Sequence, residues 1–174
     1  MGSFPPTNPR STKNSSTMAQ EIERKFLVKG DYKSQSYSCT HIEQGYFATA
    51  PGITVRVRIR DDKGYLTIKG PSSANGLGRY EFEKEISLEE AKELMKLCVP
   101  GRVNKNRWLV KSGKHTVEID EFFGENEGLV IAEIELAYEN EPYEKPDFLG
   151  QEVTGDKRYY NSHLLRNPYK NWKD

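Results

Sequence analysis

Hydrophobic and polar residues alternate along much of this chain with a period of two, which is the pattern of a β-strand with one buried face. The clearest run covers residues 53–60 and reads Ile-Thr-Val-Arg-Val-Arg-Ile-Arg, with apolar side chains on one face and arginines on the other. Turn-forming residues separate this run from similar ones before and after it. The pattern predicts about eight strands, over residues 21–28, 37–48, 53–60, 65–69, 79–86, 103–110, 114–122 and 129–138.

Helical signals are confined to short segments. Ser87 is followed three residues later by Glu90, the spacing of a capping box, and we expect this helix to run to about Leu97. The tail at residues 141–165 contains two prolines and only fragments of helical pattern. Many strands with few helices predict a mainly β protein of the α+β kind. An antiparallel barrel or sandwich is favoured over a parallel α/β sheet.

The length of 174 residues predicts a single domain with a sizeable core. Residues 1–17 are rich in Pro, Ser, Thr and Asn and lack an apolar segment, so they do not form a secretory signal. We expect them to be a disordered leader, or an extension added for expression, before a natural start at Met18. The folded domain is therefore predicted to span residues 18–174.

The composition argues against several classes of partner. The 26 Lys and Arg residues balance the 26 Asp and Glu residues, so no net field attracts the protein to nucleic acid or to an anionic membrane. No apolar run approaches the roughly 20 residues of a membrane helix. Cys39 and Cys98 have no ligand-like spacing and the three histidines are scattered, so a zinc site or a disulfide framework is unsupported. We therefore expect a reducing, cytoplasmic location.

Charged residues occupy one alternating face of nearly every predicted strand. Their parity is constant within each strand, and apolar residues often take the positions between them. On alternation alone, the simplest interpretation is a solvated charged face and an apolar face that fills the core. The charged positions are, in chain order, Glu21, Glu23, Lys25, Arg56, Arg58, Lys69, Glu81, Glu83, Lys105, Arg107, Glu118, Asp120, Glu133 and Glu135.

Two details of this charged face favour a binding site. Arginines two residues apart, such as Arg56 and Arg58, repel each other unless an anion lies between them. Acidic and basic residues are also segregated by strand, so closure of the sheet would set a basic wall opposite acidic clusters. Such a chamber suits a polyanion with divalent cations. Arginine and lysine neutralise phosphate oxygens, while carboxylates hold Mg²⁺ or Mn²⁺.

The first strand contains the pattern Glu-x-Glu-x-Lys at residues 21–25, which resembles the signature strand of the CYTH superfamily, the triphosphate tunnel metalloenzymes. The resemblance extends over residues 18–165, with order and spacing preserved. The segments that support it lie at residues 44–46, 55–58, 66–70, 81–83, 104–107, 118–122, 132–136 and 153–159.

The resemblance implies an eight-stranded antiparallel β-barrel around a polar tunnel, so that the charged face would point inward. It implies catalytic roles for Glu21, Glu23 and Lys25, and a place for Tyr46 near the tunnel mouth. The residues that would bind the triphosphate are Lys25, Arg56, Arg58, Lys69, Lys105 and Arg107. Those that would hold Mg²⁺ or Mn²⁺ are Glu21, Glu23, Glu133 and Glu135, with Glu81, Glu83, Glu118 and Asp120 completing the acidic wall or a second metal site.

The form of the first strand is similar to that of the small bacterial branch associated with inorganic triphosphatase activity. The resemblance therefore implies metal-dependent hydrolysis of tripolyphosphate, a small-molecule partner, to pyrophosphate and phosphate. Other activities stay open: a class IV type adenylate cyclase that converts ATP to cyclic AMP, a thiamine or nucleoside triphosphatase, and a module that binds polyphosphate without turnover. A homodimer also stays open.

Overall fold

The computed structural model describes residues 22–72 and 79–172, and the leader expected at 1–17 lies outside them. A single antiparallel sheet dominates the described residues, with the strand order β5-β4-β3-β2-β6-β7-β8-β1-β9. Its strands are β1 (Ile22–Val28), β2 (Ser38–Tyr46), β3 (Thr54–Arg60), β4 (Lys63–Ser72), β5 (Arg79–Ile86), β6 (Val103–Ser112), β7 (His115–Phe122), β8 (Val130–Leu136) and β9 (Leu149–Glu152).

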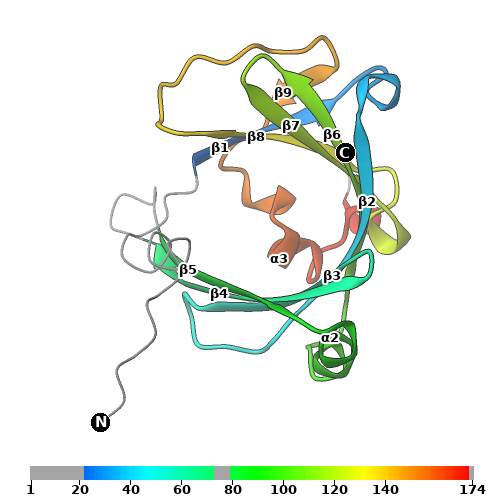
Figure 1. The fold of residues 1–174 in the computed structure, drawn as a ribbon, viewed down its shortest axis with the longest axis vertical. Coiled ribbons are helices and arrows are strands. Elements are labelled where there is room, and N and C mark those ends of the chain that lie inside the picture. Colours follow the sequence, from blue (N-terminus) through cyan, green and yellow to red (C-terminus); the bar gives the residue numbers. More distant parts are fainter. Residues whose placement is uncertain (1–21, 73–78, 173–174) are drawn as a thin grey trace.

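The sheet curves until its two ends face each other, which gives a barrel-like form (Figure 1). β3, β4 and β5 make one wall, β6, β7, β8 and β1 make the opposite wall, and β2 joins the two (Figure 1). Within the described residues the end strands β5 and β9 are not paired, so hydrogen bonds do not close the barrel. The predicted fold class and the eight predicted strands are confirmed. The additional strand, β9, has four residues, too few for alternation to reveal it.

Short helices accompany the sheet. α2 (Leu88–Met95) begins with the predicted capping box, in which the Ser87 side chain accepts from the Glu90 backbone N–H and the Glu90 carboxylate accepts from that of Ser87. None of the described helices is long and apolar enough to cross a membrane. The remaining short elements are η1 (Lys33–Gln35), η2 (Gly124–Asn126), η3 (Lys157–Tyr159), α3 (Asn161–Leu164) and η4 (Tyr169–Asn171).

Apolar side chains pack on the outer face of the sheet, which leaves the inner face to charged residues. On the β6/β7/β8/β1 wall, Phe26, Ile119 and Ile134 belong to a buried cluster that Phe148 and Leu149 complete from the segment leading into β9. Burial of these side chains is the main stabilising contribution on this side of the barrel. This part of the core therefore lies outside the barrel.

Helix α2 covers the outer face of the other wall. Its Ala91 and Met95 pack against Val57 of β3. Two glycines permit this close approach: a Cβ at Gly45 would lie 2.8 Å from Met95 Sδ, and one at Gly64 would lie 2.6 Å from the Ala91 Cβ. Gly45 faces outward, and side chains alternate along a strand. Its neighbours on β2, Gln44 and Tyr46, therefore face inward.

A third apolar cluster fills one end of the barrel. Phe122 and Ile131 follow the inward parity of Asp120 and Glu133 on their strands, and they pack with Leu164 of the C-terminal segment. α3 lies between the two walls (Figure 1). The interior is therefore apolar at this end and charged along the rest of its length.

Candidate active site

The inner faces of both walls enclose a cavity of about 680 Å³ with a mostly charged lining. Of the predicted site residues that the structure describes, all line it except Lys105 and Asp120. The full lining is Ile22, Glu23, Arg24, Lys25, Tyr46, Thr54, Arg56, Arg58, Lys69, Glu81, Glu83, Arg107, Glu118, Glu133, Glu135, Glu139, Thr154, Gly155, Tyr160, Asn161 and Ser162. These residues converge because the curvature of the sheet turns one alternating face of each strand toward a common space.

The β3/β4/β5 wall presents cations in loose contact with carboxylates. Arg56 and Arg58 lie two positions apart on β3 and therefore share the inner face. Arg56 Nη2 lies 3.9 Å from Glu83 Oε1, and Lys69 Nζ lies 3.9 Å from Glu81 Oε1. Both distances exceed the hydrogen-bond limit of about 3.2 Å. The Arg56–Glu83 ion pair can therefore yield to an anionic ligand at small cost.

Arg58 has a neutral partner instead of a carboxylate. Its Nε donates a 2.9 Å hydrogen bond to Oε1 of Gln44, and no carboxylate of the described residues lies within ion-pair distance of it. Burial lowers the pKa of Arg58, and repulsion by Arg56 and Arg107 lowers it further. Its guanidinium is thus a cation that a bound anion would stabilise.

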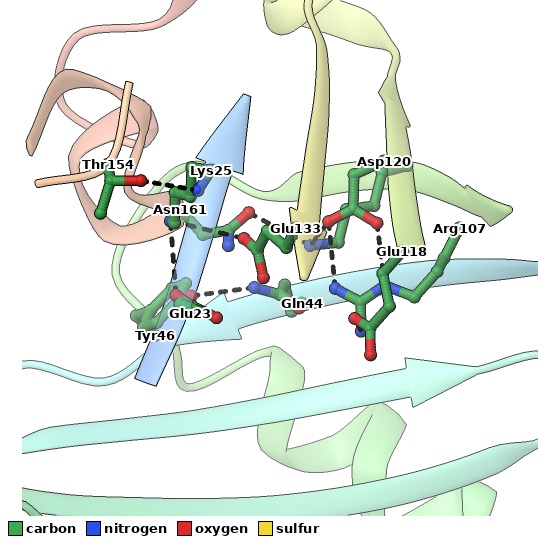
Figure 2. Close-up of polar contacts among 11 residues, drawn as sticks. Glu23, Lys25, Gln44, Tyr46, Arg107, Glu118, Asp120, Glu133, Thr154 and Asn161 are labelled. Atoms are coloured by element: carbon green, nitrogen blue, oxygen red, sulfur yellow. Dashed lines mark hydrogen bonds and ion pairs between the residues drawn. The ribbon is translucent and has the colours of Figure 1, made fainter. Parts of the chain in front are cut away.

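On the opposite wall, Lys25 of β1 is held among carboxylates (Figure 2). Lys25 Nζ lies 3.4 Å from Glu133 Oε1, 3.8 Å from Glu23 Oε1 and 4.6 Å from the centre of the Tyr160 ring. Burial alone would lower the pKa of Lys25, but Glu133 and Glu23 more than offset this effect, and the pKa is raised. Lys25 is therefore charged and oriented before any ligand binds.

Behind this surface lies a buried ionic network around Asp120 (Figure 2). Asp120 accepts 2.8 Å hydrogen bonds from Lys105 Nζ and Arg107 Nε, and a 3.0 Å bond from Arg107 Nη2. Burial alone would raise the pKa of Asp120, but Arg107 and Lys105 lower it well below its usual range. The network is complete without a ligand.

Lys105 and Asp120 do not line the cavity, although both are expected on the tunnel surface. The Lys105 side chain has an exposed fraction of 0% and lies over the Phe122 ring at 5.5 Å. It also donates a 3.3 Å hydrogen bond to Asn161 Oδ1 of α3. The apolar cluster and the C-terminal segment therefore enclose this ion pair.

Two carboxylates share Arg107. Its Nη1 lies 3.0 Å from Glu118 Oε2, while its Nε and Nη2 face Asp120 (Figure 2). Burial raises the pKa of Glu118, and Arg107 offsets this only in part because Asp120 and Glu133 repel the same carboxylate. Glu118 would consequently gain from a bound cation.

The carboxylates of the cavity form an oxygen-only donor set, which suits hard cations such as Mg²⁺ and Mn²⁺. Within the described part of the chain, no three Asp, Glu, His or Cys side chains already converge on a metal position. Lys25 lies between Glu23 and Glu133. This donor set fits a cation such as Mg²⁺, which takes one or two protein carboxylates and completes its coordination with water and phosphate oxygens.

The sequence matches the CYTH domain model over residues 19–161. The chain belongs to the CYTH family. Membership in this family implies a general dependence on a divalent metal ion.

Named relatives of this CYTH protein cover most of its length. An inorganic triphosphatase of Acetivibrio thermocellus is 51% identical over 159 residues, which are 90% of this chain and 100% of that protein. An inorganic triphosphatase of Nitrosomonas europaea is 34% identical over 151 residues, which are 83% of this chain and 95% of that protein.

The fold is also shared with solved structures. The crystal structure of an inorganic triphosphatase is 30% identical with a TM-score of 0.64, and the match covers 85% of this chain and 95% of that one. A putative adenylyl cyclase from Hippeastrum has a TM-score of 0.54 at 17% identity, over 68% of this chain and 80% of that one. At this identity the second likeness concerns the fold alone.

Sequence reasoning did not assign every residue of the CYTH site. Thr154, Tyr160 and Asn161 line the cavity from the C-terminal segment, where neutral residues in turns and a four-residue helix give no periodic signal. Gln44 could have been noticed, since it shares the inward parity of Tyr46. Glu21 lies outside the described residues, and its metal role stays a prediction.

Proposed function

We propose that this CYTH protein hydrolyses inorganic triphosphate to pyrophosphate and phosphate, with Mg²⁺ or Mn²⁺ as its cofactor. The observation that carries the proposal is a set of arginines and lysines that line one cavity of about 680 Å³ together with a set of carboxylates. The two relatives named inorganic triphosphatases, at 51% and 34% identity, support the same substrate.

In this proposal Arg56, Arg58 and Lys69 bind phosphate oxygens from the β3/β4/β5 wall. Arginine suits this role because its planar fork can donate two parallel hydrogen bonds to a phosphate. Lys25 and Arg107 reach the same space from the opposite wall. A linear triphosphate would thus be held between two sets of fixed cations, with little reorganisation needed as the reaction proceeds.

The reaction forms a bond between a water oxygen and the terminal phosphorus, and it breaks the bond from that phosphorus to the bridging oxygen. Pyrophosphate leaves with the bonding electrons, so negative charge grows on the bridging oxygen, and the attacking water releases its proton to solvent. Arg56, Arg58 and Lys25 are the groups we assign to this charge. Their contribution is electrostatic, because they are ordered before the charge develops.

We assign the divalent cation to Glu23, Glu133 and Glu135, together with the predicted ligand Glu21. When bound, the cation neutralises phosphate oxygens and lowers the pKa of water for attack. Around it, Glu81, Glu83 and Glu118 would form the remaining acidic surface of the cavity. Asp120 and Lys105 are buried, and we assign them to holding Arg107 in place rather than to ligand contact.

The proposal extends to partners and location. The partner is a small triphosphate rather than nucleic acid, because the chain has no net charge. We also propose a cytoplasmic location, because Cys39 and Cys98 are both free thiols. A homodimer remains an open part of it.

A phosphate-release assay tests the proposal. Tripolyphosphate, ATP and thiamine triphosphate are each offered with Mg²⁺ or Mn²⁺, and we expect the fastest release from tripolyphosphate and none after chelation of the metal. Cyclic AMP formed from ATP would instead identify a cyclase. Tight binding of tripolyphosphate without phosphate release under either metal would contradict the hydrolase proposal.

The variant Glu23→Ala tests, in the same assay, whether Glu23 is needed for turnover rather than for folding. Its carboxylate lines the cavity and the side chain is 38% exposed, so its removal should leave the barrel folded. We expect turnover to fall by at least about a hundredfold, with the thermal midpoint unchanged. Glu89→Ala, on an exposed position of α2, is the matched control and should retain wild-type turnover. Unfolding of Glu23→Ala would indicate a structural role instead.

A further inference from the structure

Gln44 is a buried polar residue on the inner face of β2, and no step of the proposed reaction uses it. Its exposed fraction is 0%, so it does not reach a ligand itself. It lies directly opposite Arg58 in the register of β2 and β3. Its amide oxygen accepts the 2.9 Å hydrogen bond from Arg58 Nε. Its amide nitrogen donates a 2.8 Å bond to the Tyr46 hydroxyl, which Figure 2 shows.

The direction of both hydrogen bonds follows from the chemistry of the groups. A guanidinium only donates, so the amide oxygen of Gln44 must face Arg58. The amide nitrogen then faces Tyr46, whose hydroxyl oxygen must accept. The hydroxyl hydrogen of Tyr46 is not used in this contact. Because Tyr46 lines the cavity, this hydrogen is available to an anionic oxygen there.

The same amide leaves Arg58 well suited to bind an anion. Gln44 holds the Nε atom, so the two terminal nitrogens remain as the fork for a ligand. A neutral amide orients the guanidinium without neutralising it, whereas a carboxylate would do both. Arg56 and Arg107 repel the charge of Arg58, so an anion in the cavity relieves this repulsion.

We infer that Gln44 is a positioning residue that holds the Arg58 guanidinium and the Tyr46 hydroxyl as two donors to the phosphate groups of the substrate. The inference rests on the proposed function and deepens it. It adds an uncharged donor, Tyr46, to the cationic site and names the residue that orients it. Gln44 acts through Arg58 and Tyr46, so its effect must depend on their presence.

The first test is a double-mutant cycle between Gln44→Met and Arg58→Ala. The readouts are the dissociation constant of tripolyphosphate, by calorimetry without divalent metal, and kcat/KM with Mg²⁺. In the wild-type background Gln44→Met should worsen both by roughly tenfold. In the Arg58→Ala background the loss should shrink to about threefold or less, the part that acts through Tyr46, because the guanidinium to be positioned is absent.

Equal losses in both backgrounds, or no loss in the wild-type background, would overturn the inference. The binding readout needs no turnover, which keeps the two claims distinguishable. A wild-type protein that binds tripolyphosphate without hydrolysing it contradicts only the proposed function, while the cycle on the dissociation constant still decides the role of Gln44. A wild-type protein that does not bind it overturns both.

The second test uses Gln44→Glu, which keeps the size of the side chain and the acceptor for Arg58, and which serves if Gln44→Met does not fold. A carboxylate cannot donate, so the Tyr46 hydroxyl would donate to it rather than to phosphate. Tyr46→Phe should lower kcat/KM about fivefold in the wild-type background and have no further effect in Gln44→Glu. Equal losses in both would overturn the inference. Glu43→Gln, at the neighbouring position of opposite parity, is the control and should keep wild-type values.

Discussion

The two walls of the cavity hold the same kinds of charge in different ways. In the β6/β7/β8/β1 wall, Asp120 accepts hydrogen bonds of 2.8 Å from Lys105 and Arg107, and the Lys105 side chain is fully buried. In the β3/β4/β5 wall, Arg56 and Lys69 lie 3.9 Å from their glutamates, and Arg58 is held by an amide. The buried network of the first wall is satisfied internally, whereas the cations of the second wall face the cavity.

This difference follows from solvent access. A charge buried without its partner costs several kcal/mol, so the enclosed ions of the first wall must be closely matched. Cations that line an open cavity are compensated by water, and loose pairing there costs little. We conclude that the buried network around Asp120 contributes chiefly to stability, whereas the charged residues that line the cavity contribute chiefly to binding.

The largest effect on stability is expected from Asp120→Asn. It leaves the buried charges of Lys105 and Arg107 without their shared carboxylate, and we expect a loss of about 3–5 kcal/mol in the free energy of unfolding by urea. Because the folded state lowers the pKa of Asp120, its contribution is present above the ordinary value of 3.8 and is lost as the pH falls through the folded value. Glu83→Gln, on the other wall, should cost less than about 1 kcal/mol. Equal losses for the two variants would contradict the division.

The second prediction concerns the β3/β4/β5 wall, where we expect a large loss of activity and little change in stability. Arg58→Ala should lower kcat/KM for tripolyphosphate on the order of a hundredfold, because it removes a cation placed for the developing charge. Its free energy of unfolding should be unchanged or slightly higher, since Arg56 and Arg107 repel this group. Arg60→Ala is the control on the same strand, because Arg60 is exposed and contacts Tyr65. A large loss of stability in Arg58→Ala would show that the β3/β4/β5 wall is structural as well.

The smallest effect on stability is expected at Glu118, which lines the cavity and also forms an ion pair with Arg107. The folded state raises the pKa of Glu118, so keeping it ionised at pH 7 disfavours folding. Glu118→Gln should therefore increase stability at pH 7 by less than about 1 kcal/mol, and the gain should vanish as the pH falls below the ordinary value of 4.5. Turnover should fall in the same variant. A loss of stability at pH 7 would instead show that the 3.0 Å ion pair with Arg107 dominates.

The sequence predicts the positions of the charged side chains better on one of these two walls than on the other. Arg56 and Arg58 could be placed because strict alternation fixes the face of every side chain on β3, and the resemblance indicated that this face points inward. Alternation places Lys105 on the inner face as well, but it does not reveal what covers it. The cover comes from Phe122 and from Asn161 in the distant C-terminal segment, a tertiary contact with no local signal.

The partnership of Gln44 with Arg58 was also beyond reach of the sequence alone. It requires the register of β2 and β3, which pairs these two residues directly. β9 could not be predicted either, because its four residues are identified by their pairing with β1 and not by a sequence pattern. Local periodicity therefore predicted the strands and the charged face, while contacts between segments determined which charges remain accessible.

The most direct test of the account is a crystal structure with tripolyphosphate and Mn²⁺, with the metal located by anomalous scattering. We predict phosphate oxygens against Arg56, Arg58 and Lys69, and Mn²⁺ against Glu23, Glu133 or Glu135, with Lys105 and Asp120 still bound to each other. Triphosphate bound outside the cavity, or held by Lys105 with its bond to Asp120 broken, would contradict the division between a buried stabilising network and the binding residues of the cavity.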